Sequence, residues 1–225
     1  MNQLTRQALT GLGQLIVALA VLLFLPAMSL DYWEGWVFLI VFPVSVLVIT
    51  LYFLKRDPGL IESRIRAGPG AEKEKSQRMI QAIASIFFIL TFIVPGLDHH
   101  FGWSMVPLPL VIAGDILVVL GLGIIFLVFR ENRFTSGVIE VGRDQTVIST
   151  GPYAVVRHPM YAGAFIMLFG IPPALGSWWA FMFVILLFAA IAWRLIDEEK
   201  FLSKNLPGYH EYCGKVRYRL VPFVW

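Results

Sequence analysis

The sequence has little of what a disulfide-linked, metal-binding or water-soluble protein needs. One cysteine, Cys213, occurs among 225 residues, which excludes an internal disulfide and any site with several cysteine ligands. Only 15% of the residues are charged, whereas 58% are hydrophobic, and the mean hydropathy is +0.74. A soluble domain of this length does not need so much apolar surface. The composition therefore predicts an integral membrane protein.

Several functional signals are also missing. No internal repeat is evident, which argues against a transporter built from duplicated halves. No tract of lysine and arginine is interleaved with aromatic residues, so nothing predicts nucleic-acid binding. His99 and His100 are adjacent, with only Asp98 beside them, and this spacing is a weak metal signal. The lipid bilayer is the predicted partner, and the oligomeric state stays open.

Six apolar segments are long enough, or nearly so, to cross a bilayer. They are residues 8–27, 35–54, 79–96, 108–129, 160–176 and 178–195. The first could instead be a cleaved signal peptide, because Ala27-Met28-Ser29 follows it. Its apolar run is, however, longer than the roughly 7–15 residues of a typical signal-peptide core. The predicted fold class is all-α integral membrane with about six transmembrane helices.

The connections between these segments carry the topology signal. All 18 lysines and arginines lie before the first segment, in the 55–78 loop, in residues 130–158, or from Arg194 onward. The three opposite turns contain none, which is the positive-inside pattern. Both termini and both long polar segments are therefore predicted to be cytoplasmic. The 55–78 loop could include a short surface helix, and residues 146–150 form a β-like run.

The last two apolar segments are predicted to form a tight hairpin, which turns at Pro172, Pro173, Gly176 and Ser177. The chain as a whole is predicted to divide into two parts after residue 129. Residues 1–129 hold spans one to four with the cytoplasmic loop 55–78. Residues 130–225 hold a polar segment, the hairpin and a cytoplasmic tail.

Two polar clusters are predicted to meet at the cytoplasmic ends of the hairpin. His158 and Tyr161 are three residues apart, next to Arg157, and share one helix face. Arg194 and Glu198 are four apart and share another. Polar side chains at a membrane edge are costly and mark candidate sites. A site there could join a polar cofactor from the cytosol to a substrate from the bilayer.

Simpler interpretations of these residues remain open. Arg157 and His158 could be interfacial anchors. Arg194 could extend to the lipid head groups, and Glu198-Glu199-Lys200 could be a solvated helix end. Gly121-Leu-Gly123 is best interpreted as a helix-packing patch.

The stretch Gly151-Pro-Tyr-Ala-Val-Val-Arg-His-Pro-Met-Tyr-Ala-Gly163 is followed by Arg194-x-x-x-Glu198-Glu199 and by Tyr209-x-x-Tyr212-x-x-x-Val216. This ordered set resembles the isoprenylcysteine carboxyl methyltransferase family, and the related phospholipid N-methyltransferases share its layout. The resemblance covers roughly residues 130–222. It implies an S-adenosylmethionine-dependent methyltransferase with a lipophilic or membrane-delivered acceptor, such as a prenylcysteine-like carboxylate. A thiol or a phospholipid amine is the alternative acceptor.

The resemblance also implies which residues form the site. Arg194 matches an arginine associated with the substrate carboxylate, and Arg157 is a second candidate catalytic residue. The family often has a histidine where this chain has Gln145. The implied cofactor-binding residues are Gln145, Thr146, Val147, Ile148, Tyr153, His158, Pro159, Met160, Tyr161, Glu198 and Glu199.

The chemistry of these residue types suits such a cofactor, which carries a sulfonium, an ammonium, a carboxylate and ribose hydroxyls. Glu198 can accept hydrogen bonds from the ammonium or the hydroxyls, and Arg157 or His158 can pair with the carboxylate. Tyr153 and Tyr161 offer ring faces to the adenine or the sulfonium. An anionic nucleophile needs alignment rather than a general base. No metal is required.

The C-terminal tail supports a second functional hypothesis, a reductase. Val216-Arg-Tyr-Arg-Leu-Val-Pro222 also resembles the end of the membrane sterol reductases, which use NADPH. A third hypothesis is a non-catalytic membrane protein that keeps the fold for packing or partner binding.

Overall fold

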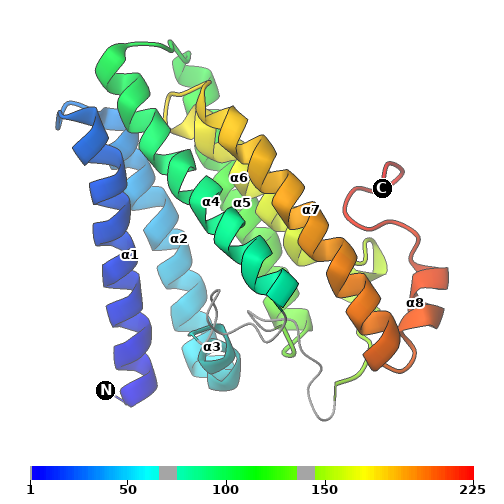
Figure 1. The fold of residues 1–225 in the computed structure, drawn as a ribbon. Helices are drawn as coiled ribbons and strands as arrows, with labels where there is room; N and C mark the ends of the chain where they lie inside the picture. The colour runs from blue at the N-terminus through cyan, green and yellow to red at the C-terminus, as the bar shows by residue number, and fades with distance from the viewer. Residues whose placement is uncertain (1, 66–74, 136–144) are drawn as a thin grey trace.

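A computed structural model describes residues 2–65, 75–135 and 145–225 (Figure 1). The described chain is helical and has no β-strand. Its elements, in order, are α1 (Gln3–Ala27), α2 (Trp33–Arg56), α3 (Pro58–Ile65), α4 (Lys75–Phe101), α5 (Leu108–Glu131), the 3₁₀ turn η2 (Gly151–Ala154), α6 (Pro159–Ala174), α7 (Ala180–Asn205) and α8 (Tyr209–Lys215).

The helices confirm an all-α integral membrane protein. Five of them, α1, α2, α4, α5 and α7, are long and apolar enough to cross a membrane, and α6 is apolar but shorter. Large apolar side chains cover the outside of the bundle; Leu25 is 72% exposed and Ile40 and Ile185 are each 63% exposed. Such a surface is costly in water and suits hydrocarbon. All six predicted apolar segments are helical.

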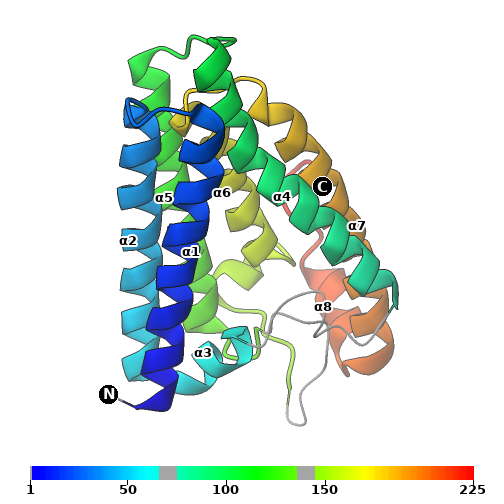
Figure 2. The same ribbon diagram turned by 60° about the vertical axis from the view of Figure 1, so that its left-hand side comes forward.

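Figure 2 shows α4 and α7 running side by side, tilted against α1 and α2. The helix α6 packs mainly on α5, and α7 mainly on α4. The short turn predicted between α6 and α7 is present, and Gly176 takes a positive φ of 67° within it. The hairpin is therefore tight at its turn, while each of its helices packs chiefly on another partner.

The contact between α5 and α6 depends on glycine. A Cβ atom at Gly121 would lie 2.5 Å from the carbonyl oxygen of Gly163, and one at Gly163 would lie 2.9 Å from the carbonyl oxygen of Gly121. Small residues allow this approach of two helices in lipid. Gly121 thus has the expected packing role, whereas a Cβ at Gly123 would meet nothing within 4 Å. This contact holds the first turns of α6 against α5.

Two expectations concern the connections. The short helix expected within the 55–78 loop is α3, which buries Leu60 and Ile61. The β-like run expected at 146–150 is not a strand. The physical reason is that β-branched residues favour a strand only when a second strand pairs with them, and no segment of the described chain does so.

The end of the bundle far from the N-terminus is held by a closed polar cluster. Asp98 is only 2% exposed. It accepts hydrogen bonds from the Ser104 amide at 2.7 Å, from the Ser104 hydroxyl at 2.6 Å and from the Ser177 hydroxyl. Nearby, the Tyr32 hydroxyl donates to the Leu175 carbonyl at 2.7 Å. These bonds tie together the three turns at this end.

Candidate functional site

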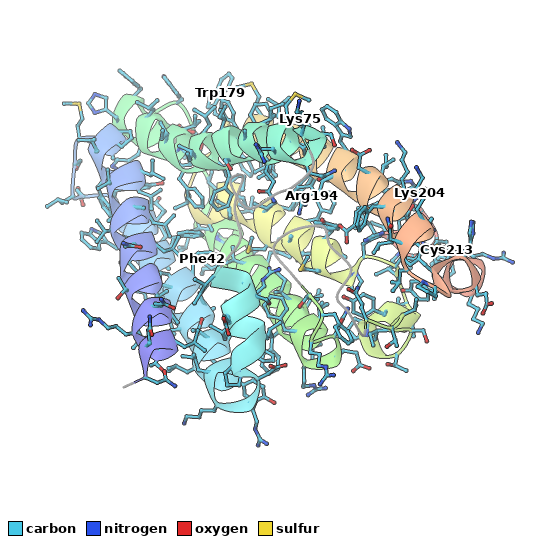
Figure 3. The ribbon with its side chains drawn as sticks, turned by 60° about the horizontal axis from the view of Figure 1, so that its bottom comes forward. Phe42, Lys75, Trp179, Arg194, Lys204 and Cys213 are labelled. Carbon is cyan, nitrogen blue, oxygen red and sulfur yellow. The ribbon has the colours of Figure 1, made fainter. Side chains whose placement is uncertain are left out.

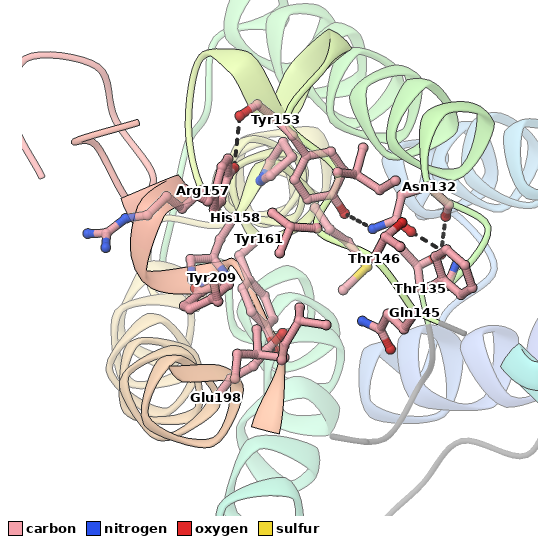
Figure 4. A pocket seen from close by; sticks show the side chains of 18 residues that line it. Asn132, Thr135, Gln145, Thr146, Tyr153, Arg157, His158, Tyr161, Glu198 and Tyr209 are labelled. Atoms are coloured by element: carbon pink, nitrogen blue, oxygen red, sulfur yellow. Dashed lines mark hydrogen bonds between the residues drawn. The ribbon is translucent and has the colours of Figure 1, made fainter. Parts of the chain in front are cut away.

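A cavity lies at the other end of the bundle, where α6 begins and α7 ends (Figure 4). It holds about 810 Å³ of empty space, its open mouth included. The predicted residues 145–148, Tyr153, 158–161 and Glu198 all line it, together with Arg157. Four separate segments therefore bring the predicted residues to one place, and Glu199 and Arg194 lie outside the lining.

The wall at η2 is built around Tyr153. Its hydroxyl accepts a hydrogen bond from the Asn132 amide at 3.0 Å, and its carbonyl accepts one from the Tyr212 hydroxyl at 2.8 Å. Burial raises the pKa of Tyr153 to about 12. Tyr153 is therefore a neutral phenol at physiological pH, and its ring is held against the cavity by bonds at both ends.

The start of α6 is held by the tail of the chain. The amides of Arg157 and His158 donate to the carbonyls of Tyr218 and Arg219 at 2.8 and 2.9 Å. Pro159 then takes the first position of the helix, where a missing N–H costs nothing. The tail thus fixes the His-Pro-Met-Tyr segment against the cavity.

The two predicted polar clusters do meet. The Tyr161 hydroxyl donates to Glu198 Oε2 at 2.6 Å, and Arg194 Nε donates to the same hydroxyl at 3.2 Å. Arg194 Nη1 also donates to Gln77 Oε1 on α4 at 3.0 Å. A line of contacts therefore runs from the cavity, through Tyr161, to an arginine held between α7 and α4. Figure 3 views the bundle from this end and places Arg194 on the inner side of α7.

Glu199 faces a different group of residues from its neighbour Glu198. It pairs with Arg219 Nε at 2.8 Å, Arg157 Nη1 at 3.2 Å and His158 Nε2 at 3.3 Å. Figure 4 shows the guanidinium of Arg157 directed away from the cavity. Glu199 therefore joins α7 to the start of α6 and to the tail. The predicted cofactor contact of Glu199 and the predicted catalytic role of Arg157 stay predictions.

Sequence reasoning missed several residues of this region. Asn132 and Tyr209 line the cavity, and Gln77 holds Arg194. Arg64 of α3 places its guanidinium 4.8 Å from the centre of the Phe129 ring, and burial lowers its pKa. Gln77 and Arg64 lie in the segment 55–78, which was predicted to be a charged cytoplasmic loop. The Tyr209-x-x-Tyr212 pattern was the available signal for Tyr209.

Arg64 also lines a second, more open cavity, which lies between α1, α2 and α3. This cavity holds about 1590 Å³ of empty space. Gln3, Gln7 and Gln14, spaced along one face of α1, contribute to its wall. These glutamines stand beside apolar residues such as Leu12 and Val46, so the wall of this second cavity is mixed.

The first cavity can bind a zwitterionic or cationic ligand with an aromatic part. Glu198 supplies a carboxylate, while Val147, Ile148 and Leu202 supply apolar wall beside the rings of Tyr153 and Tyr161. Across the described ranges, no group of three His, Cys, Asp or Glu side chains is placed to hold a metal ion.

The fold and the cavity together define a multi-pass membrane protein with an open pocket at one end of its helices. The model of the phospholipid methyltransferase family matches residues 109–207, which are 99 of the 225 residues. The matched part runs from α5 through α7 and includes all of the predicted site residues.

A curated relative gives a second similarity. The Delta(14)-sterol reductase of Mus musculus is 30% identical to this chain over 105 residues. The match covers 43% of this chain and 25% of the reductase. The chain therefore corresponds to only about a quarter of that relative's length.

Proposed function

We propose that this protein is an integral membrane methyltransferase that uses S-adenosylmethionine, similar to the isoprenylcysteine carboxyl methyltransferases. Its acceptor is lipophilic or delivered from the membrane. The observation that carries the proposal is the cavity where α6 begins and α7 ends. It gathers residues 145–148, Tyr153, 158–161 and Glu198 within the segment that matches the phospholipid methyltransferase family.

The residues that line the cavity fit the cofactor. Glu198 would accept from the ammonium or from the ribose hydroxyls. The rings of Tyr153 and Tyr161 would contact the adenine or the sulfonium, and Val147 and Ile148 would cover its apolar surface. Once bound, the cofactor supplies a methyl group on a positively charged sulfur. The chain aligns the two reactants and keeps water out.

On the acceptor side we assign Arg194. A guanidinium can orient a carboxylate with two parallel hydrogen bonds. Tyr161 and Gln77 hold Arg194 in place, so it would meet an acceptor without first losing conformational freedom. A carboxylate acceptor is already anionic, so no general base has to be assigned. A prenylcysteine-like carboxylate is the acceptor that this arrangement supports best.

We further propose that the cavity and both termini face the cytoplasm. The support is the positive-inside distribution of lysine and arginine, which gathers at the end of the bundle that holds the cavity. We retain the division at residue 129, with residues 130–225 as the methyltransferase core. Within that core, Asn132 bonds to Tyr153, and the tail bonds to the residues that begin α6.

Binding of radiolabelled S-adenosylmethionine by purified full-length protein in detergent tests the function. We expect Glu198→Gln to raise the Kd at least about tenfold, because a hydrogen bond to a charged group contributes roughly 1.5–3 kcal/mol. Glu211→Gln on α8 is the matched control, since Glu211 is exposed. If the wild type and Glu198→Gln bind the cofactor equally weakly, the proposed function is wrong.

A second candidate function is an NADPH-dependent reductase. The similarity to the mouse Delta(14)-sterol reductase and the Tyr-Arg-Leu-x-Pro ending favour it. The same binding assay with NADPH separates the two candidates, because each predicts saturable binding of a different cofactor. Binding of neither would favour a non-catalytic role.

A further inference from the structure

The hydroxyl group of Tyr209 is a buried donor that has no acceptor among the residues that the structure describes. Tyr209 is 4% exposed, and its side chain lines the cavity. Its oxygen is buried and makes no hydrogen bond in the described chain. A buried hydroxyl without a partner costs roughly 1–3 kcal/mol, and native proteins rarely leave one unexplained. Its position in the cavity wall points to an acceptor that belongs to a ligand.

Packing holds Tyr209 in this position. Gly208 takes a positive φ of 81° and turns the chain into α8. Tyr209 then packs in an apolar cluster with Leu206, Tyr212 and Val216. Its ring lies 6.0 Å from that of Tyr212, measured between centroids. A side chain fixed in this way presents its hydroxyl with little loss of rotamer freedom on binding.

Tyr212 provides a contrast on the same short helix. It also lines the cavity, but its hydroxyl donates to the Tyr153 carbonyl at 2.8 Å. The two tyrosines therefore share a helix, a cluster and a cavity. They differ in whether the protein itself supplies the acceptor.

The group of the ligand that accepts the hydrogen bond from Tyr209 can be inferred from the other donors near the cavity, which already have partners in the protein. Arg157 and His158 are the obvious partners for a ligand carboxylate, but both pair with Glu199. Burial, with a further contribution from Glu199, raises the pKa of Tyr209, so its hydroxyl stays a neutral donor. Glu198, in the same wall, can only accept when ionised. The cavity thus offers a donor and an acceptor that match the two charged groups of an amino acid.

We infer that Tyr209 is a further cofactor-binding residue. Its hydroxyl donates to the carboxylate of the amino-acid part of S-adenosylmethionine, and Glu198 accepts from the ammonium of the same part. The inference rests on the proposed function and names which end of the cofactor lies between α7 and α8.

The test compares two variants and two ligands. The variants are Tyr209→Phe and Tyr212→Phe, each in the full-length protein in detergent. The ligands are S-adenosylmethionine and its decarboxylated form, which lacks only the carboxylate. The Kd of each ligand and the thermal unfolding temperature are measured for both variants and for the wild type.

Tyr209→Phe should raise the Kd of S-adenosylmethionine about 10- to 100-fold, which is the effect of losing a hydrogen bond to a charged group. It should change the Kd of the decarboxylated form less than about twofold and should not lower the unfolding temperature, because the hydroxyl has no hydrogen-bond partner in the described part of the chain. Tyr212→Phe should lower the unfolding temperature and should change the Kd of both ligands by the same factor, because its hydroxyl holds Tyr153 and makes no bond to the carboxylate.

Other results overturn the inference in distinguishable ways. If the wild type binds S-adenosylmethionine and Tyr209→Phe binds it equally well, the hydroxyl makes no bond to the cofactor. If Tyr209→Phe weakens both ligands equally, the hydroxyl does not serve the carboxylate. If the wild type binds neither ligand, the proposed function fails, and the inference fails with it.

Discussion

A polar cluster lies at each end of the bundle, and the two use their hydrogen bonds in different ways. At one end, the carboxylate of Asp98 accepts from Ser104 and Ser177, and every partner comes from the turns that it joins. At the other end, Glu198 borders a cavity of about 810 Å³. In a closed cluster, the hydrogen bonds are all made within the protein and stabilise the fold. In a cluster beside a cavity, some polar groups face the cavity and can bond to a ligand.

The same contrast recurs between two adjacent residues. Glu199 is enclosed by Arg157, His158 and Arg219, while Glu198 meets Tyr161 and the cavity. Successive residues on a helix point about 100° apart, so one of the pair can hold the structure while the other faces the ligand. Chemical type alone therefore does not separate a structural carboxylate from a binding one.

Arg194→Ala should produce the largest effect and should act on transfer alone. We expect turnover of a carboxylate acceptor, an S-prenylated N-acetylcysteine, to fall about 10²–10³-fold, as when one preorganised donor is lost. The Kd of S-adenosylmethionine should change less than about threefold, since Arg194 does not line the cavity. Lys200→Ala, at an exposed position of α7, is the control. Unchanged turnover of this acceptor would remove Arg194 from the substrate role.

Asp98→Ala should break the closed cluster and leave the cavity intact. Two serine hydroxyls and one amide would lose their acceptor, which should lower the free energy of unfolding by about 2–4 kcal/mol. Thermal unfolding in detergent measures this loss, with the exposed Asp31→Ala as control. The folded fraction should bind S-adenosylmethionine with the wild-type Kd. A raised Kd would show that the two ends are coupled and that the contrast between them is too simple.

Tyr161→Phe should give the smallest effect, because Tyr161 both makes hydrogen bonds within the protein and lines the cavity. Its hydroxyl has partners in the protein, Glu198 and Arg194, yet its side chain lines the cavity. We expect a roughly fivefold rise in the Kd of S-adenosylmethionine, equivalent to about 1 kcal/mol. Equilibrium binding measures this change, with Tyr52→Phe, a half-exposed residue of α2, as control. A loss of affinity as large as that of Glu198→Gln would make the hydroxyl a direct ligand contact.

Much of the site could be predicted because it depends on short stretches. Each of the groups 145–148, 158–161 and Arg194 with Glu198 lies within a few residues along the chain, so a motif and a helical spacing are enough to identify it. Gln77 could not be found in this way. Its bond to Arg194 crosses 117 residues of sequence and exists only because α4 packs on α7.

The sequence by itself determined the membrane class, the helical segments and the two polar clusters, because hydrophobicity and helical period are local properties. Only the tertiary structure decided how those clusters are used. The packing of α5 on α6 and of α7 on α4 places Glu198 at a cavity and Glu199 among cations. The fold of the tail brings Tyr209, a residue of an otherwise ordinary pattern, into the same cavity. Distances between segments far apart in the chain depend on how whole helices pack, and no local pattern records that.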